Sequence, residues 1–443
     1  MTTLERCIPC TQGAPMSPVD ENASGENADE QLAGSLRECP DCGLFQYVPA
    51  VEPGEGAQCA RCQGMLRRRT LQGVVLPLVC VSVASVLFAM ALYFPIMSLH
   101  VLGRFASATV FDGPIRLLNY GTWQLTLLVV LTLMVMPTVK LAVMLASLVA
   151  TTVSWRSRRL AWAFGWLELI TPWAMLEVFL VGAGVAYTRL HAIADVQVEP
   201  ALIFAGAFVL VLAAADAVMD REAVWQGIGG THQAAISDKS VPLIGCDVCG
   251  LVLRAEPTEH CPRCAHSLEH RKPNSIARVW ACVIGAAILY VPANLLPVMT
   301  IVRGGRGGSH TIMGGVVELA ENHLWGLAVL VFLASVAVPL LKLAILTSIL
   351  VLTGRGSPAY LRWRTRLFKL VRAIGRWSMI DVFMVTIFVG LLHMGPLSNV
   401  SPDSGSMAFA AVVVLTMIAT EALDPRLMWD AASGSLLKEP AAT

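Results

Sequence analysis

The chain has 443 residues, of which 56% are hydrophobic and only 14% are charged, and its formal net charge at pH 7 is +1. A soluble globular protein carries about 25% charged residues, so the composition excludes an ordinary soluble domain and indicates a polytopic membrane protein. The balanced charge gives no indication that the partner is a nucleic acid.

Residues 1–38 are polar and rich in Gly, Ser, Glu and Asn. They contain no apolar core of the kind that a signal peptidase recognises, so we expect a disordered leader rather than a secretory signal. Within this leader, Cys7 and Cys10 form a lone CxxC pair without a second pair beside it. We interpret these two cysteines as incidental thiols.

Two four-cysteine modules lie about 200 residues apart, at 39–66 and 244–270, and each consists of two CxxC pairs. A glycine, Gly43 or Gly250, follows the first pair of each module and suits a turn with positive φ. The eight cysteines are Cys39, Cys42, Cys59, Cys62, Cys246, Cys249, Cys261 and Cys264.

Eight apolar stretches are long enough to cross about 30 Å of hydrocarbon, which takes about 20 residues of helix. In the first half of the chain they lie near 74–97, 124–151, 161–187 and 201–219. In the second half they lie near 277–299, 324–352, 367–393 and 406–423.

The two halves are related by duplication. Pro137 and Lys140 recur as Pro339 and Lys342 at an offset of 202 residues, and WAMLEVFLVG at 173–182 faces WSMIDVFMVT at an offset of 204. A register maintained over most of each half indicates an internal repeat, and four helices per repeat make the two repeats parallel.

We therefore predict a mostly α membrane protein, with eight transmembrane helices in two parallel four-helix repeats, each preceded by a small cytosolic zinc ribbon with β structure. The predicted units are a leader (1–38), zinc ribbon 1 (39–66), membrane domain 1 (70–225), a linker (226–243), zinc ribbon 2 (244–270), membrane domain 2 (274–430) and a tail (431–443).

Basic residues predict the orientation. Short loops rich in Arg and Lys stay in the cytosol, and here they precede the first, third, fifth and seventh predicted helices, whereas the opposite loops are poor in both. Both termini and both cysteine modules are therefore expected in the cytosol. A basic loop could also bind anionic lipids. The basic residues are Arg67, Arg68, Arg69, Arg156, Arg158, Arg159, Arg271, Lys272, Arg278, Arg355, Arg362, Arg364, Arg366, Lys369 and Arg372.

The cytosol is reducing, so the paired CxxC motifs favour a metal site over disulfides. Four thiolates complete a tetrahedral zinc sphere, which predicts two structural Zn²⁺ ions per chain. A thioredoxin-like redox role requires a βαβ pattern that is not found around these pairs. His260 could replace one ligand but is better explained as a bystander, and Cys80 and Cys282 as packing residues.

Four ionisable residues lie inside predicted helices, where charge is costly. Lys140 and Lys342 each follow a proline by three residues and could form a polar site around an internal axis or extend their stems to the headgroups. Glu177 and Asp381 are placed near the middle of their helices. We expect them to be neutral, paired with lysine, lining a wet cavity, or hydrogen-bonded between helices. All four are candidates for a transport or polar network.

Duplicated CPxCG-like ribbons, each followed by four helices and a WAMLEVF or WSMIDVF segment, resemble the paraquat-inducible protein A family over about 39–430. The second module departs slightly, with CDVCG in place of CPxCG. The resemblance implies a Gram-negative inner-membrane protein that moves lipid between membranes beside a periplasmic tunnel of MCE-domain proteins. The loops near 98–122 and 300–323 would then dock that partner or shape a lipid entry, or serve only as surface loops.

No P-loop, Ser/His/Asp constellation or HExxH motif is present in the sequence, so we expect no enzyme. Two functional classes remain. The first is a membrane subunit that loads or unloads phospholipid from a periplasmic tunnel. The second is a scaffold or signalling module whose zinc ribbons bind a cytosolic partner. A groove between the helices would favour the first, and a tightly packed bundle with exposed ribbons the second.

Overall fold

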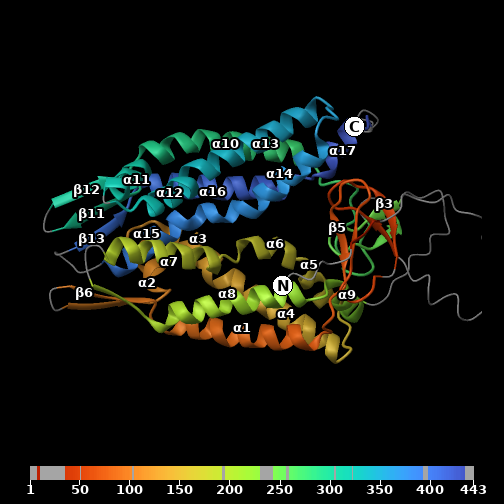
Figure 1. The fold of residues 1–443 in the computed structure, drawn as a ribbon, viewed down its shortest axis with the longest axis horizontal. Coiled ribbons are helices and arrows are strands. Elements are labelled where there is room, and N and C mark those ends of the chain that lie inside the picture. The colour runs from red at the N-terminus through yellow and green to blue at the C-terminus, as the bar shows by residue number, and fades with distance from the viewer. Residues whose placement is uncertain are drawn as a thin grey trace, which may run out of the picture.

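The helices of the protein form a bundle with small β-sheets at both of its ends, as the computed structural model shows (Figure 1). Strands β6, β11, β12 and β13 lie at one end, and strands β3 and β5 of the cysteine modules lie at the other (Figure 1). The structure describes residues 7–9, 35–49, 51–101, 104–191, 195–229, 243–255, 259–303, 306–321, 323–392 and 398–434.

Within the described residues, eight helical segments are long and apolar enough to span a membrane, which confirms the predicted class and number. Four belong to each half of the chain. They are Val75–Tyr93, Trp123–Thr152, Arg158–His191, Pro200–Val218, Ser275–Leu295, Trp325–Gly354, Leu361–Leu391 and Ser404–Ala422.

The first repeat contains α1 (Val75–Tyr93), α2 (Asp112–Asn119), α3 (Trp123–Val130), α4 (Met136–Thr152), α5 (Arg158–Gly165), α6 (Leu167–Ile170), α7 (Leu176–His191), α8 (Pro200–Val218) and α9 (Arg221–Gly229). The second contains α10 (Ser275–Leu295), α11 (Ile312–Glu321), α12 (Trp325–Phe332), α13 (Val338–Gly354), α14 (Leu361–Ile374), α15 (Ile380–Leu391), α16 (Ser404–Ala422) and α17 (Arg426–Ala432). Since α9 extends to Gly229, helix continues into the first residues of the predicted linker.

Both repeats have prolines at equivalent positions, and these prolines change the helices in the same way. Helices α1 and α10 are followed by Phe94 and Leu296, which are extended because a proline comes after each of them. A π-helical turn, Leu131–Val135 or Leu333–Ala337, precedes α4 and α13, and a proline occupies the first turn of each helix. Proline has no backbone N–H to continue the α-helical hydrogen bonds, so the hydrogen-bond pattern changes in the turn beside it.

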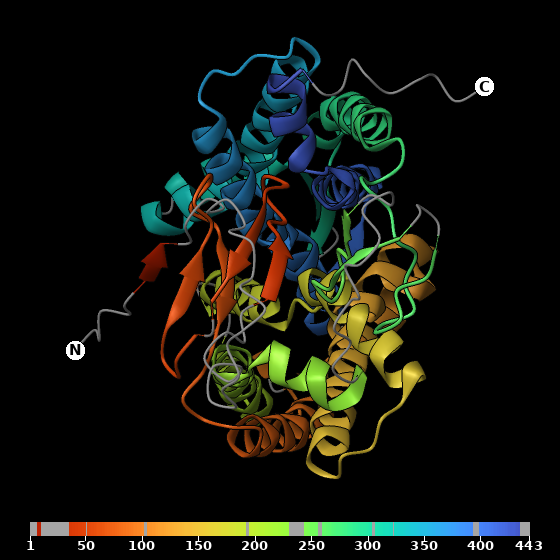
Figure 2. The same ribbon diagram turned by 90° about the vertical axis from the view of Figure 1, so that its right-hand side faces the viewer.

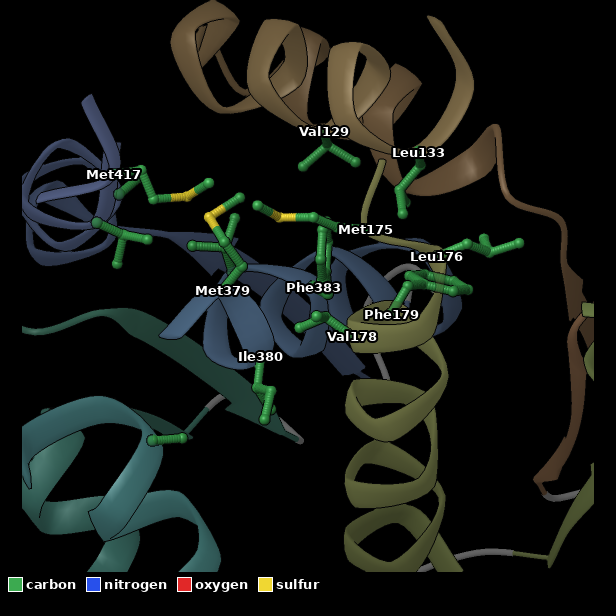
Figure 3. Close-up of a cluster of buried hydrophobic side chains, with 14 of the residues drawn as sticks. Val129, Leu133, Met175, Leu176, Val178, Phe179, Met379, Ile380, Phe383 and Met417 are labelled. Atoms are coloured by element: carbon green, nitrogen blue, oxygen red, sulfur yellow. The ribbon is translucent and has the colours of Figure 1, made fainter. Parts of the chain in front are cut away.

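The first and last helices of each repeat pack together, α1 on α8 and α10 on α16. The two repeats meet where α7 packs on α15. There the rings of Phe179 and Phe383, which occupy equivalent positions in the two copies, lie 5.9 Å apart at 78° (Figure 3). Met175 and Met379, another equivalent pair, lie in the same apolar cluster (Figure 3). Duplicated residues thus form the core between the repeats.

The third and seventh predicted helices are interrupted, which sequence periodicity did not indicate. In the first repeat a 3-10 turn, Thr171–Trp173, is followed by extended Ala174 before α7 begins. In the second, a 3-10 turn, Gly375–Met379, precedes α15. Glu177 and Asp381 lie well inside the third and seventh candidate spans, as expected, but the helix of each span changes just before them. Each lies in the first turn of a new helix, where the helix dipole favours a carboxylate.

The loops opposite the cysteine modules form two three-stranded antiparallel sheets. In the first, β6 (Met97–Val101) pairs with both β7 (Arg104–Ala108) and β8 (Asp195–Val198). In the second, β11 (Met299–Arg303) pairs with both β12 (Arg306–His310) and β13 (Ser398–Pro402). Each sheet joins two loops that are distant in sequence, so it ties together the ends of four membrane spans.

The cysteine modules contain short strands. In the first module β2 (Ser35–Glu38) pairs with β3 (Phe45–Val48), and β4 (Gly56–Gln58) pairs with β5 (Met65–Arg68) and with β1 (Cys7–Pro9). In the second module β9 (Leu243–Gly245) pairs with β10 (Val252–Arg254). Strands β1 and β2 lie within residues 1–38, which we expected to be a disordered leader. These two parts of the segment form strands instead. Cys10 lies outside the described residues.

Candidate functional site

The four cysteines of each module converge on one point. In the first module the Sγ atoms of Cys39 and Cys62 are 3.5 Å apart, and those of Cys42 and Cys59 are 3.6 Å apart. The second module repeats both distances. A tetrahedral metal with bonds of about 2.3 Å to sulfur would place its ligands about 3.8 Å apart. These buried thiols are not joined by disulfides, so each set of four fits one metal ion. His260 is exposed and lies outside the second set.

The first module docks on both repeats. Arg37 of β2 lies 2.6 Å from Glu222 of α9 in the first repeat, and the other contacts reach the second repeat. Asp41 accepts a 2.5 Å bond from Lys369 of α14, and Arg362 donates to the backbone carbonyl of Arg61. The Arg61 guanidinium also lies 4.6 Å from the ring centre of Trp429 in α17. Two residues of the basic loop that predicted orientation therefore also bind the module.

The second module makes the reciprocal contact with the first repeat. The imidazole of His266 packs on the rings of Trp162 and Trp166, with ring centres 6.1 and 6.0 Å apart. Arg263 donates a 2.9 Å bond to Glu222 of α9 and lies over Trp225. Each module thus contacts helices of both repeats. Figure 2 views this end of the molecule, where the strands of the first module lie in front of helices from both halves.

One arginine joins both modules to the second repeat. Arg426 is 3% exposed and donates to Asp424, to Glu38 beside the first cysteine cluster and to Asp247 inside the second. Burial opposes its charge, but these carboxylates outweigh that effect and raise the pKa of Arg426 above its ordinary value. Burial also raises the pKa of Glu38, although Arg426 and Arg271 oppose the shift. Removing Arg426 alone would leave three carboxylates without their shared cation.

The two predicted lysines are buried within the protein. Lys140 is 3% exposed and donates a 2.6 Å bond to Asp216 of α8. Lys342 is 1% exposed and donates to the carbonyl of Gly375, at the interruption before α15. Neither lysine extends along the protein surface, so the structure places them in helix-to-helix contacts.

The two predicted carboxylates occupy equivalent positions but have different surroundings. Glu177 lies 2.5 Å from Arg376, and its side chain is about one-third exposed. Asp381 is 5% exposed, and neither of its oxygen atoms accepts a hydrogen bond. Among the described residues no lysine pairs with either carboxylate, which differs from that part of the prediction. The Lys342 contact with Gly375 and the side chain of Arg376 both lie at the interruption before α15. Asp381 takes part in neither contact and lines a cavity instead.

Asp381 lines a cavity of about 240 Å³ between the end of α7, α11, α12, α15 and the hairpin of β11 and β12. Most of the lining is apolar, including Met299, Leu319 and Phe388. The polar lining consists of Asp381, Arg189, His310, Thr311 and Glu318. Sequence analysis did not identify Arg189, His310 or Glu318. Arg189 could have been noticed as an arginine adjoining a membrane span on the side poor in basic residues.

The equivalent region of the other half is filled. There α2 packs against α15 so closely that a Cβ on Gly113 would lie 2.5 Å from Thr386 Cγ2 and 2.7 Å from the Thr386 carbonyl oxygen. The equivalent glycine, Gly315, instead lies on the cavity wall beside the guanidinium of Arg189. One copy of the repeat is therefore closed, and the other leaves an opening.

Comparison with known proteins finds relatives of similar sequence along most of the chain. A family model described as "Paraquat-inducible protein A" matches residues 76–229 and 276–433. The chain is 28% identical over 431 residues to "Lipophilic envelope-spanning tunnel protein A" of Escherichia coli K12, an alignment that covers 95% of this chain and 96% of that protein. It is 29% identical to "Intermembrane transport protein PqiA" of the same organism, over 88% of this chain and 95% of that one.

A third relative is "Probable intermembrane transport protein" of Haemophilus influenzae, which is 26% identical over 89% of this chain and 95% of its own length. No solved structure matches the chain.

Proposed function

Since the chain belongs to the paraquat-inducible protein A family, we propose that it is the integral inner-membrane subunit of an intermembrane lipid transport system. In this role it passes phospholipid, or another lipid, between the inner membrane and a tunnel across the periplasm. The names of its relatives support intermembrane transport. A subunit of this kind has no reaction to catalyse, so any uphill step draws energy from a partner or an ion gradient.

The observation that carries this proposal is the cavity between α11 and α15. It has apolar walls, yet it contains a buried carboxylate with no hydrogen bond. Ionisable groups are retained within a membrane protein mainly where they face a pathway or a partner group, because burying an unpaired charge costs several kcal/mol. A purely structural helix contact would have given Asp381 a basic partner, as Arg376 is for Glu177.

The scaffold alternative gains less support. It requires ribbons that are free to bind a cytosolic protein, whereas both modules are already docked on the membrane repeats. It also predicts a tightly packed bundle, whereas the packing is open beside α11. The opening is a cavity in one half of the molecule and not the continuous groove that was expected for transport, and it supports the transport role through that half.

We further propose that both cysteine modules hold structural Zn²⁺. Their thiol geometry and burial support a closed tetrahedral site. Bound zinc would supply the folding free energy of modules that contain little apolar core. With four protein ligands at each site, the metal would have no open position for catalysis.

The proposed partner is a periplasmic MCE-domain tunnel, and the two three-stranded sheets form the surface proposed to meet it. They lie at the opposite end of the helices from the cysteine modules. If the modules are cytosolic, as the basic loops predict, the sheets and the nearby cavity face the periplasm. Both termini are then cytosolic.

Reporter fusions test this orientation. Fusions after Trp155 and Ser357 should report a cytosolic location, and fusions at Ala108 and Arg306 a periplasmic one, because the first two sites adjoin the arginine-rich loops. Alkaline phosphatase and fluorescent-protein activities provide opposite readouts. A periplasmic signal at Ser357 would overturn the orientation and the reducing environment on which the zinc proposal depends.

Lipid transfer by purified protein tests the function. The full chain is reconstituted into donor vesicles that contain a fluorescent phospholipid, and soluble MCE-domain tunnel protein is added as the acceptor. We expect transfer into the tunnel protein that requires the full chain. Empty vesicles and vesicles containing an unrelated eight-helix membrane protein are the controls. Transfer no faster than in these controls would favour the scaffold role.

A further inference from the structure

The cavity that contains Asp381 presents unsatisfied groups of both charges. Both Asp381 oxygens and the Nε of Arg189 are buried, and none makes a hydrogen bond of normal geometry, although the Ser335 hydroxyl lies close enough to stabilise the Asp381 charge. The two residues interact electrostatically, but no ion pair joins these described side chains. A terminal nitrogen of Arg189 makes only a long 3.4 Å contact with the Gly315 carbonyl. The site therefore holds one acceptor and one donor that are not used on each other.

From this arrangement we propose that the cavity binds the headgroup of a zwitterionic phospholipid with a primary ammonium, the ammonium at Asp381 and the phosphate at Arg189. The proposal rests on the lipid-transport function and specifies its substrate. A carboxylate accepts charge-assisted hydrogen bonds from an ammonium, and guanidinium recognises phosphate. One ligand of this chemistry satisfies both buried groups.

The size and walls of the cavity support a headgroup rather than a whole lipid. Its volume of about 240 Å³ is below the roughly 300–1,000 Å³ of pockets that enclose a drug-sized ligand. Apolar side chains such as Val331 and Met384 line the rest of the cavity and suit the start of an acyl chain. At its rim, His310 lies 3.5 Å from Glu318, whose side chain is 57% exposed.

Two related headgroups should bind less well. A phosphatidylglycerol headgroup has the phosphate but no cation for Asp381. A phosphatidylcholine headgroup has a cation, but its quaternary nitrogen has no N–H to donate, so Asp381 would remain without a hydrogen bond. The expected order is phosphatidylethanolamine above phosphatidylcholine and phosphatidylglycerol.

Competition among lipids tests this order. The full chain, purified in detergent and stripped of lipid, is mixed with equal amounts of the three phospholipids with matched acyl chains, and bound lipid is counted by native mass spectrometry. We expect phosphatidylethanolamine to exceed each competitor by about tenfold, the ratio given by about 1.4 kcal/mol. Asp381→Asn should reduce this ratio to near one, whereas Arg189→Gln should weaken all three lipids together.

Glu177→Gln is the matched control, because it removes the equivalent carboxylate of the other repeat and should leave the preference intact. Equal binding of the three lipids by the unaltered protein, or a preference that survives Asp381→Asn, would refute the headgroup assignment while leaving transport in place. If no phospholipid binds and none is transferred, the transport function itself fails. The comparison in the unaltered protein is informative even if a variant does not fold.

Discussion

Cys42→Ser is expected to lower the zinc content from two ions to one per chain and to unfold the first cysteine module. Cys42 lies 3.6 Å from Cys59 within a cluster that fits one metal. Structural zinc contributes about 10–16 kcal/mol to small domains at neutral pH, far more than the short β2–β3 and β4–β5 pairings can replace. Elemental analysis of the purified chain and limited proteolysis of 35–69 measure the two effects.

Cys80→Ser is the matched control, because Cys80 lies in α1 away from both clusters. It should leave both zinc ions and the proteolysis pattern unchanged. A further consequence of Cys42→Ser is expected at α14, where Lys369 loses its bond to Asp41. A chain that contains no metal and yet resists proteolysis throughout 35–69 would refute the zinc proposal.

Asp381→Asn is expected to reduce lipid transfer by at least about tenfold, equivalent to 1.4 kcal/mol or more, without destabilising the protein. Asparagine keeps the shape of the side chain but removes a buried charge that has no hydrogen bond. Removing such a charge should leave thermal stability unchanged or raise it, because the desolvation cost of the charge is also removed. Transfer in reconstituted vesicles and the thermal unfolding midpoint separate the two effects.

Glu177→Gln is expected to retain transfer, because Glu177 is partly exposed and already paired with Arg376. The two acids have the same place in the duplicated sequence, so the contrast depends on their surroundings in the fold. If both variants lose transfer equally, the pathway runs through both halves and not through the cavity alone. If Asp381→Asn transfers lipid normally, the cavity has no part in transport.

Hydrophobic length and cysteine spacing were sufficient to predict the eight spans and the two cysteine clusters. Both depend on local properties of the chain, since a span requires about 20 apolar residues and one turn between cysteines directs two thiolates to one ion. The internal duplication then predicted that residues such as Phe179 and Phe383 are equivalent. In the structure these two residues meet at the interface of the repeats.

The differences between the copies could not be predicted in this way. Gly113 and Gly315 have equivalent sequence positions, yet one packs on Thr386 and the other lines a cavity. Their difference arises from how the whole repeats pack, which no local pattern encodes. The interruptions before α7 and α15 were missed for a related reason: apolar composition continues through them, although Pro172 was a local signal in the first repeat.

The docking of the first module on α14 of the second repeat has a consequence for biosynthesis. Asp41 and its partner Lys369 are separated by 328 residues, so at about 5–20 residues per second the ribosome makes the docking helix roughly 15–65 s after the first module has emerged. Until then the module has only its contact with the first repeat, where Arg37 pairs with Glu222 of α9. A newly made module that had captured its metal could wait as a folded unit, whereas one without metal would be exposed to proteases before its partner helix exists. The supply of metal during translation, rather than the final stability of the bundle, would then decide how much protein matures.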